Sequence, residues 1–138
     1  METLIGALPQ IRSVIDGGLV VLIWLVQLII YPVFHQIEAE RLRSWHAYYV
    51  RRMGRIVGPM MLLQVAVVLT QLIYFGGILN LLSGCLVLGC WVCTALFSIP
   101  CHRKIEQGKA DSKVLSRLVI TNWPRTILWT AVFAVGLF

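Results

Sequence analysis

The chain has 138 residues, of which 59% are hydrophobic and 13% are charged, and its formal net charge is +6. This length allows one domain, residues 1–138, and the charged fraction is about half of the roughly 25% that is typical of soluble domains. A soluble protein this apolar would expose large hydrophobic patches, so the composition predicts an integral membrane protein in contact with the lipid bilayer. It excludes a nucleic-acid partner, because all but two of the twelve Lys and Arg lie in two short segments, 41–55 and 103–117.

The first predicted element is a transmembrane helix over about residues 14–34. Residues 17–37 contain no Asp, Glu, Lys or Arg, and about 20 apolar residues are enough to cross the hydrocarbon core of a bilayer. The run is too long for a signal peptide, Glu2 precedes it, and no small-residue cleavage site follows. We therefore expect a retained first crossing.

The next two helices come from one long run without formal charge. Between Arg55 and Arg103 there are 47 such residues, which as a single helix would reach about 70 Å, against about 30 Å of hydrocarbon. The pair Gly76-Gly77 supplies turn residues. The run therefore predicts helices that end at 75 and begin at 78, the second of them spanning 78–99.

Strong helix formers fill segment 38–54, which predicts that the second helix begins at 39, before the membrane. We expect a helix over 39–75 that includes this cytoplasmic extension and bends near Gly58-Pro59. The last helix spans about 114–138, with Asp111 or Ser112 as its N-terminal cap. The predicted fold class is all-α, a four-helix transmembrane bundle.

The basic segments predict how the bundle is oriented. Loops rich in Lys and Arg face the cytoplasm, and the two loops at 36–55 and 103–117 hold ten such residues. Both termini and the Gly76-Gly77 turn then lie on the extracytoplasmic side. The bias also argues against the dual-topology exporters, whose loops carry balanced charge. We expect the chain to lie in a bacterial inner (plasma) membrane.

Polar residues recur on one face of each predicted helix, which indicates a bundle whose polar groups point inward. At 1.5 Å per residue, four of them lie about 8–13 Å inside the cytoplasmic ends of the membrane crossings, which we place near residues 34, 55, 99 and 118, and are predicted to form one layer; they are Gln27, Gln64, Thr94 and Arg125. A second group is expected just on the cytoplasmic side of this layer: Tyr31, His35, His46, His102 and Asn122. The two groups predict a polar cavity near the cytoplasmic leaflet. The alternative is that these side chains only bond helix to helix.

Arg125 is the strongest single indication of a site, because an arginine in hydrocarbon costs about 2.5–3.5 kcal/mol on insertion scales. It needs a partner, and Asp16 is predicted to lie too far away, at the outer end of its helix. A ligand anion or oxygen, the Tyr31 hydroxyl and backbone carbonyls are the candidates. The alternative is that Arg125 extends to the headgroups.

The histidines and cysteines permit further chemistry. His35, His46 and His102 are weak candidates for metal or haem ligands, without a motif such as H-x-x-x-H, and no metal or cofactor is assigned; His46 is also a candidate acid–base group. Cys90 and Cys93 resemble the redox pair of the vitamin K epoxide reductase and disulfide-bond oxidase families. Those enzymes need a second pair in an extracytoplasmic loop, and here that loop is only the Gly76-Gly77 turn. We interpret the pair as packing residues, with redox activity as the alternative.

Several segments resemble a group of small bacterial four-helix membrane proteins of undefined function: QLIIYPVF (27–34), WHAYYVRRM (45–53), PMMLLQ (59–64), TALFSIPCH (94–102) and LVITNWPRTILWT (118–130). That group is similar to a wider family that includes the fungal anthrone oxygenases. The resemblance implies a cofactor-poor oxygenase, or a binder of flat aromatic or quinone-like molecules, that uses His46, Asn122, Arg125 and Trp129.

Two hypotheses follow. The first is a site for an amphipathic aromatic or quinone-like compound, with oxidoreductase or oxygenase activity if it is catalytic. His46 and Arg125 are its candidate catalytic residues, and its candidate ligand-binding residues are Gln27, Tyr31, Gln64, Thr94, Asn122 and Trp129. The second is a non-catalytic accessory or structural subunit of a larger membrane complex, or a homo-oligomer, in which the polar groups only hold the bundle together. A transporter is a weaker alternative, because no carboxylate is expected at the membrane centre.

Overall fold

The computed structural model describes residues 2–138, and within them four long helical rods follow one another along the chain. The first rod joins α1 (Glu2–Leu25), the π-helix η1 (Val26–Ile30), α2 (Tyr31–Val33) and η2 (Phe34–Gln36), and the second is α3 (Ala39–Phe75). The third joins α4 (Ile78–Cys93), the π-helix η3 (Thr94–Ser98) and α5 (Ile99–Glu106), and the fourth is α6 (Ser112–Val135). All four are long and apolar enough to cross a membrane. The predicted all-α, four-helix transmembrane architecture is confirmed.

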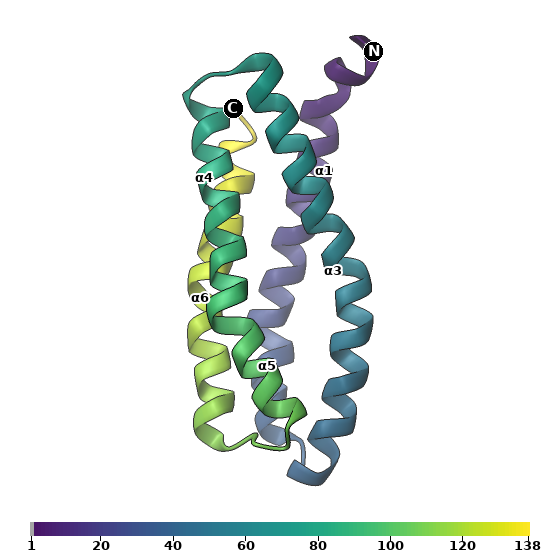
Figure 1. Ribbon diagram of the computed structural model, residues 1–138, viewed down its shortest axis with the longest axis vertical. Helices are drawn as coiled ribbons and strands as arrows, with labels where there is room; N and C mark the ends of the chain where they lie inside the picture. Colours follow the sequence, from purple (N-terminus) through teal and green to yellow (C-terminus); the bar gives the residue numbers. More distant parts are fainter. Residues whose placement is uncertain (1) are drawn as a thin grey trace.

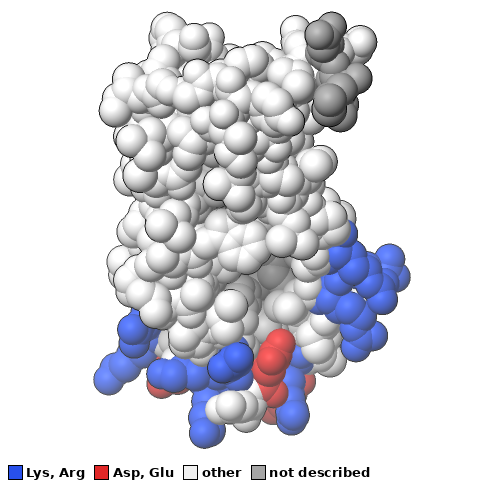
Figure 2. All heavy atoms as spheres, turned by 45° about the horizontal axis from the view of Figure 1, so that its top comes forward, with Lys and Arg blue, Asp and Glu red and all other residues white. Residues whose placement is uncertain are grey.

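The rods form an antiparallel bundle in which α1 and α4 each pack against both α3 and α6. Both chain ends and the α3–α4 turn lie at one end of the bundle, here called the terminal end (Figure 1). The turn is made as predicted by Gly76 and Gly77, at φ 60° and 83°, a region open to glycine because it lacks Cβ. Lys and Arg gather at the opposite end, here called the basic end (Figure 2). Which end faces the cytoplasm stays a prediction.

Three of the four rods have ends that differ from those predicted. The first rod begins at Glu2 rather than 14, the third continues to Glu106 rather than 99, and the fourth is Ser112–Val135 rather than 114–138. Hydropathy identifies the apolar stretch of a helix and not its full hydrogen-bonded length. Polar turns at the helix ends are therefore not predicted from it. The second helix is α3, as predicted, and the Asp111 carboxylate caps α6 by accepting the Val114 N–H at 2.7 Å.

Pro59 lies inside α3, and Figure 1 shows this helix changing direction part-way along its length. A proline removes one backbone hydrogen bond and clashes with the preceding turn, which bends a helix. The bend matters because residues of α3 from Tyr49 to Met61 form one wall of a cavity.

The two π-helices occupy equivalent places in the first and third rods. Each ends two residues before a proline, η1 before Pro32 and η3 before Pro100. Proline lacks the N–H that would bond the carbonyl four residues earlier, and one widened turn is a common response, often at functional sites. The widened turns carry Gln27 on η1 and Thr94 and Ser98 on η3, which all face the interior polar groups described next.

Candidate functional site

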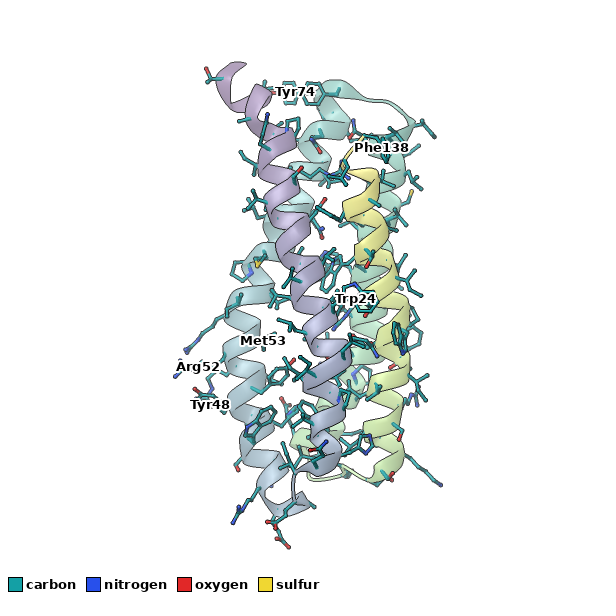
Figure 3. The ribbon with its side chains drawn as sticks, turned by 180° about the vertical axis from the view of Figure 1, so that it is seen from behind. Trp24, Tyr48, Arg52, Met53, Tyr74 and Phe138 are labelled. Carbon is teal, nitrogen blue, oxygen red and sulfur yellow. The ribbon has the colours of Figure 1, made fainter. Side chains whose placement is uncertain are left out.

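A cavity of about 400 Å³ lies in the half of the bundle toward the basic end, between the first rod, α3, η3–α5 and α6. Ligand-binding cavities in proteins have about 300–1,000 Å³. Its walls are largely apolar, with Ile23, Val26, Met53, Val57 and Met61 among them. In Figure 3 Met53 lies on the side of α3 that faces α1, whereas Tyr48 and Arg52 point away from the bundle. The polar groups of the cavity are concentrated on η3, α5 and α6, with Tyr31 from the first rod.

Among the side chains that the structure describes, Arg125 is the buried cation that lines this cavity, with 8% of its surface exposed. Its Nη1 donates to the Ser98 hydroxyl at 2.9 Å and to the Thr94 hydroxyl at 3.4 Å, and its guanidinium lies 5.4 Å from the centre of the Trp129 ring. Its Nε is buried without a partner, and no carboxylate among the side chains that the structure describes lies within ion-pair distance. Arg125 therefore points into the bundle and not to the headgroups, and its charge has no counter-ion among these residues.

Beside the cavity, three side chains form a hydrogen-bonded row. The Tyr31 hydroxyl lies 3.0 Å from His102 Nε2, and His102 Nδ1 lies 2.7 Å from His46 Nε2. Tyr31 and His102 line the cavity, whereas His46 is fully buried behind them and packs against Phe34 and Tyr49. The row leads away from the cavity and stops at His46 Nδ1, a buried atom without a partner. A row of this kind is suited to proton transfer.

A second polar cluster lies on the terminal side of the cavity and was not predicted from the sequence. Arg12 Nε donates to Asp16 Oδ2 at 3.1 Å, and the other nitrogens of Arg12 donate to Gln71 at 3.2 Å and Ser83 at 2.6 Å. Gln64 Nε2 donates to Asp16 Oδ1 at 2.6 Å. We call these five residues the Arg12–Asp16 cluster. The sequence signal for its ion pair was the spacing of Arg12 and Asp16, which lie four residues apart on one helix and therefore on the same face.

A third cluster joins the first rod to α6. Asn122 Nδ2 donates to Gln27 Oε1 at 2.8 Å, and Gln27 Nε2 donates to the Val119 carbonyl at 3.2 Å. Thr126 contacts both, at 3.4 Å from each partner. These groups bond to one another at the helix interface and do not line the cavity, and the Asn122 Oδ1 is buried without a partner. Their geometry matches the helix-to-helix bonding that was the alternative for this pattern.

The four residues predicted to form one layer do not all bond to one another. Thr94 and Arg125 do meet, but Gln27 belongs to the Asn122 cluster, and Gln64 bonds Asp16 and, at 3.3 Å, Trp129 Nε1. Counting residues from a helix end gives a height along the bundle and not the direction in which a side chain points.

Of the predicted site residues, Tyr31, Thr94, Arg125 and Trp129 line the cavity. Gln27, Gln64, Asn122 and His46 lie outside it, His46 being connected through His102. Ser98 and Tyr49 line it as well and were not predicted as site residues. The sequence signal for Ser98 was its place among the polar residues on one face of its helix.

The three histidines do not form a cluster, because His35 is exposed and takes no part in the His46–His102 contact. Within residues 2–138 no three His, Cys, Asp or Glu side chains are placed to hold a metal ion. Cys90 and Cys93 lie one helical turn apart as free thiols, Cys90 buried and Cys93 partly so. Their interpretation as packing residues stays a prediction, with redox activity as the alternative.

Comparison with protein families, with curated proteins and with solved structures finds no match for this chain. The resemblance to small bacterial membrane proteins and to the anthrone oxygenase family therefore stays a prediction.

Proposed function

We propose that this chain is a membrane protein whose cavity binds a small amphipathic aromatic or quinone-like molecule and transfers protons to it, as an oxidoreductase or oxygenase requires. The observation that carries the proposal is the guanidinium of Arg125, which is buried, lines a cavity of about 400 Å³ and has an unpartnered Nε. Buried charges in proteins are paired or bind a ligand, because an unpaired one is costly. A ligand oxygen in the cavity would supply a partner for the guanidinium.

The side chains around Arg125 suit a flat ligand with an oxygen at one end. Trp129 and Tyr31 present aromatic surface to the cavity, and the facing wall from α3 is apolar. Arginine holds an oxygen through a planar fork of N–H donors, which sets the orientation of the ligand as well as its affinity.

The row Tyr31–His102–His46 provides the proton transfer. In one arrangement His46 Nε2–H donates to His102 Nδ1, His102 Nε2–H donates to the Tyr31 oxygen, and the Tyr31 proton is free to bond a ligand. When Tyr31 gives that proton to the ligand, each neighbour shifts its proton by one bond, and His46 Nδ1 takes up one proton from solvent water at the far end. The row then has the opposite polarity, with Tyr31 donating to His102 and His102 donating to His46. One proton has entered the ligand, and one has been taken up at His46.

Filling the cavity should abolish ligand retention without unfolding the protein. Gly54 lines the cavity, and a Cβ added there meets no atom within 4 Å. Gly54→Phe places a ring in this space and also improves helix propensity. We expect an aromatic or quinone-like compound to co-purify with the native chain in lipid nanodiscs and to be absent from Gly54→Phe, as measured by mass spectrometry of extracted small molecules.

The matched control is Gly6→Phe, an exposed glycine of α1 with equally open space around it and no part in the cavity. It should retain the compound. Equal retention in Gly54→Phe and the native chain would place the compound elsewhere, and a native chain that carries no small molecule besides lipid would count against a ligand site.

We also propose that the basic end faces the cytoplasm and the terminal end the outside of a bacterial inner membrane, because ten of the twelve Lys and Arg surround the former. A cysteine at Lys109, in the α5–α6 loop, should react with a membrane-impermeant maleimide only after the cells are opened. A cysteine at Ile78, 74% exposed beside the α3–α4 turn, should react in intact cells. The unsubstituted chain supplies the background, and the reverse pattern would invert the assignment.

A further inference from the structure

The charges inside the bundle do not cancel. Among the side chains that the structure describes, the buried charged ones are Arg12, Asp16 and Arg125, at 4%, 1% and 8% exposure. Two positive charges and one negative charge leave a net +1. A charge in a low-dielectric interior is stabilised by an opposite charge nearby far more than by neutral groups.

Asp16 is not available as the counter-ion of Arg125. Its Oδ2 accepts from Arg12 at 3.1 Å, and its Oδ1 accepts from Gln64 at 2.6 Å. Both oxygens are thus committed within the Arg12–Asp16 cluster, and Arg12 neutralises the carboxylate. The excess charge belongs to Arg125.

The immediate partners of Arg125 are neutral. They are the hydroxyls of Ser98 and Thr94 and the face of Trp129, and the Thr94 hydroxyl already donates to the Cys90 carbonyl at 2.8 Å. Glu106 is the carboxylate that lines the same cavity, but it is exposed near the basic end and forms no ion pair with Arg125. The guanidinium therefore lies beside the cavity with an unbalanced charge, and its Nε is buried without a partner.

We propose that the ligand is an amphipathic aromatic weak acid that binds as its monoanion, with a carboxylate or an acidic enol or phenol oxygen against Arg125. This inference rests on the proposed function and specifies its ligand class. One negative charge makes the buried charges sum to zero, and the apolar walls from Ile23, Val26 and Val57 accept the uncharged body. The Tyr31 hydroxyl supplies a second donor to the anion in the arrangement in which His102 donates to it.

A lipid headgroup phosphate is the other source of a monoanion, and the position of Arg125 disfavours it. Arg125 lies thirteen residues from the start of α6 at Ser112, about 20 Å at 1.5 Å per residue. Arg103 is exposed and lines the cavity on α5, four residues beyond Ile99, toward the basic end. A phosphate that approached from the headgroups would meet Arg103 before Arg125, so we assign the site to a free aromatic acid.

The test uses two probes of nearly the same shape, 2-hydroxy-1,4-naphthoquinone, which is an anion at neutral pH, and its neutral 2-methoxy ether. Binding to the full chain in nanodiscs of neutral lipid is measured by equilibrium dialysis, with empty nanodiscs subtracted. A hydrogen bond to a charged group contributes about 1.5–3 kcal/mol, so the anion should bind roughly 10- to 100-fold more tightly than the ether. Arg125→Gln should remove this preference, and Arg117→Gln, at an exposed arginine of the same helix outside the cavity, should keep it.

The outcomes separate the inference from the proposed function. Equal or tighter binding of the ether by the native chain would overturn the anionic ligand class and leave an aromatic site in place. If neither probe binds, both the inference and the aromatic site fail. In nanodiscs with phosphatidylglycerol, an anionic lipid retained by the native chain and lost in Arg125→Gln, as seen by native mass spectrometry, would identify the headgroup as the occupant and overturn the free acid.

Discussion

Asp16→Asn is expected to lower the free energy of unfolding by roughly 3–5 kcal/mol, the loss typical when one partner of a buried ion pair is removed. Arg12 and Asp16 are almost fully buried, and the carboxylate holds both Arg12 at 3.1 Å and Gln64 at 2.6 Å. Asparagine keeps the shape but leaves the Arg12 charge without a counter-ion between three helices. The change is measured by unfolding the purified protein with increasing concentrations of a denaturing detergent and following the loss of helix by circular dichroism.

The chain contains its own control, because Glu38 and Arg41 form a second local ion pair at 3.4 Å whose side chains are 70% and 82% exposed. Exposed pairs contribute about 0–1 kcal/mol, so Glu38→Gln should change stability little. The double variant Arg12→Leu/Asp16→Leu removes both charges and should recover part of the loss. If Asp16→Asn costs no more than Glu38→Gln, the buried ion pair does not hold the bundle together.

Arg125→Lys and Arg125→Leu are both expected to leave the protein folded while ligand retention falls roughly 10- to 100-fold, the equivalent of about 1.5–3 kcal/mol for a charged hydrogen bond. Lysine keeps the charge but cannot reproduce the planar fork of donors. Leucine removes a buried charge and an unpartnered Nε. Of the side chains that bond Arg125, mainly the Ser98 hydroxyl then lacks a hydrogen-bond partner, because the Thr94 hydroxyl keeps its bond to a backbone carbonyl. Thermal stability of the leucine variant should therefore match or exceed that of the native chain.

Thermal unfolding in detergent and mass spectrometry of bound small molecules are measured side by side for both variants. Arg117→Leu is the control, since Arg117 lies on the same helix and is exposed. A leucine variant that loses several kcal/mol, together with a native chain that carries no small molecule, would make Arg125 a bundle-stabilising residue. That result would favour the accessory or structural subunit over a ligand site.

The outline of the fold followed from hydropathy and charge, because lipid imposes a simple rule. Backbone polar groups in hydrocarbon must be satisfied within the chain, so each apolar run of sufficient length is a helix. The Gly76-Gly77 turn, the helix over 39–75 and the Asp111 cap are each properties of a few neighbouring residues, and the structure confirms all three. The helix ends at Glu2 and Glu106 were missed because polar turns extend a helix without contributing to its hydropathy.

The candidate site was predicted only in part, because it depends on the direction in which each side chain points as well as on its height along the bundle. Helical spacing placed Tyr31, Thr94, Arg125 and Trp129 on inward faces, and these residues line the cavity. Gln27, Gln64 and Asn122 also point inward but meet partners on neighbouring helices. Which of the inward side chains bond to one another is decided by how the helices are rotated and bent, including at the π-helices before Pro32 and Pro100.

By itself the sequence determined that the chain is an apolar four-helix protein with two basic loops at one end and with Arg125 on an inward face. Composition and periodicity suffice for this, since they report how each helix meets lipid. Only the tertiary structure decided that Arg12 neutralises Asp16 and that Tyr31, His102 and His46 join in a row. Most of these contacts cross between helices far apart in the chain, so their distances depend on packing. Among the described side chains, packing leaves Arg125 beside the cavity as the buried charge without a counter-ion.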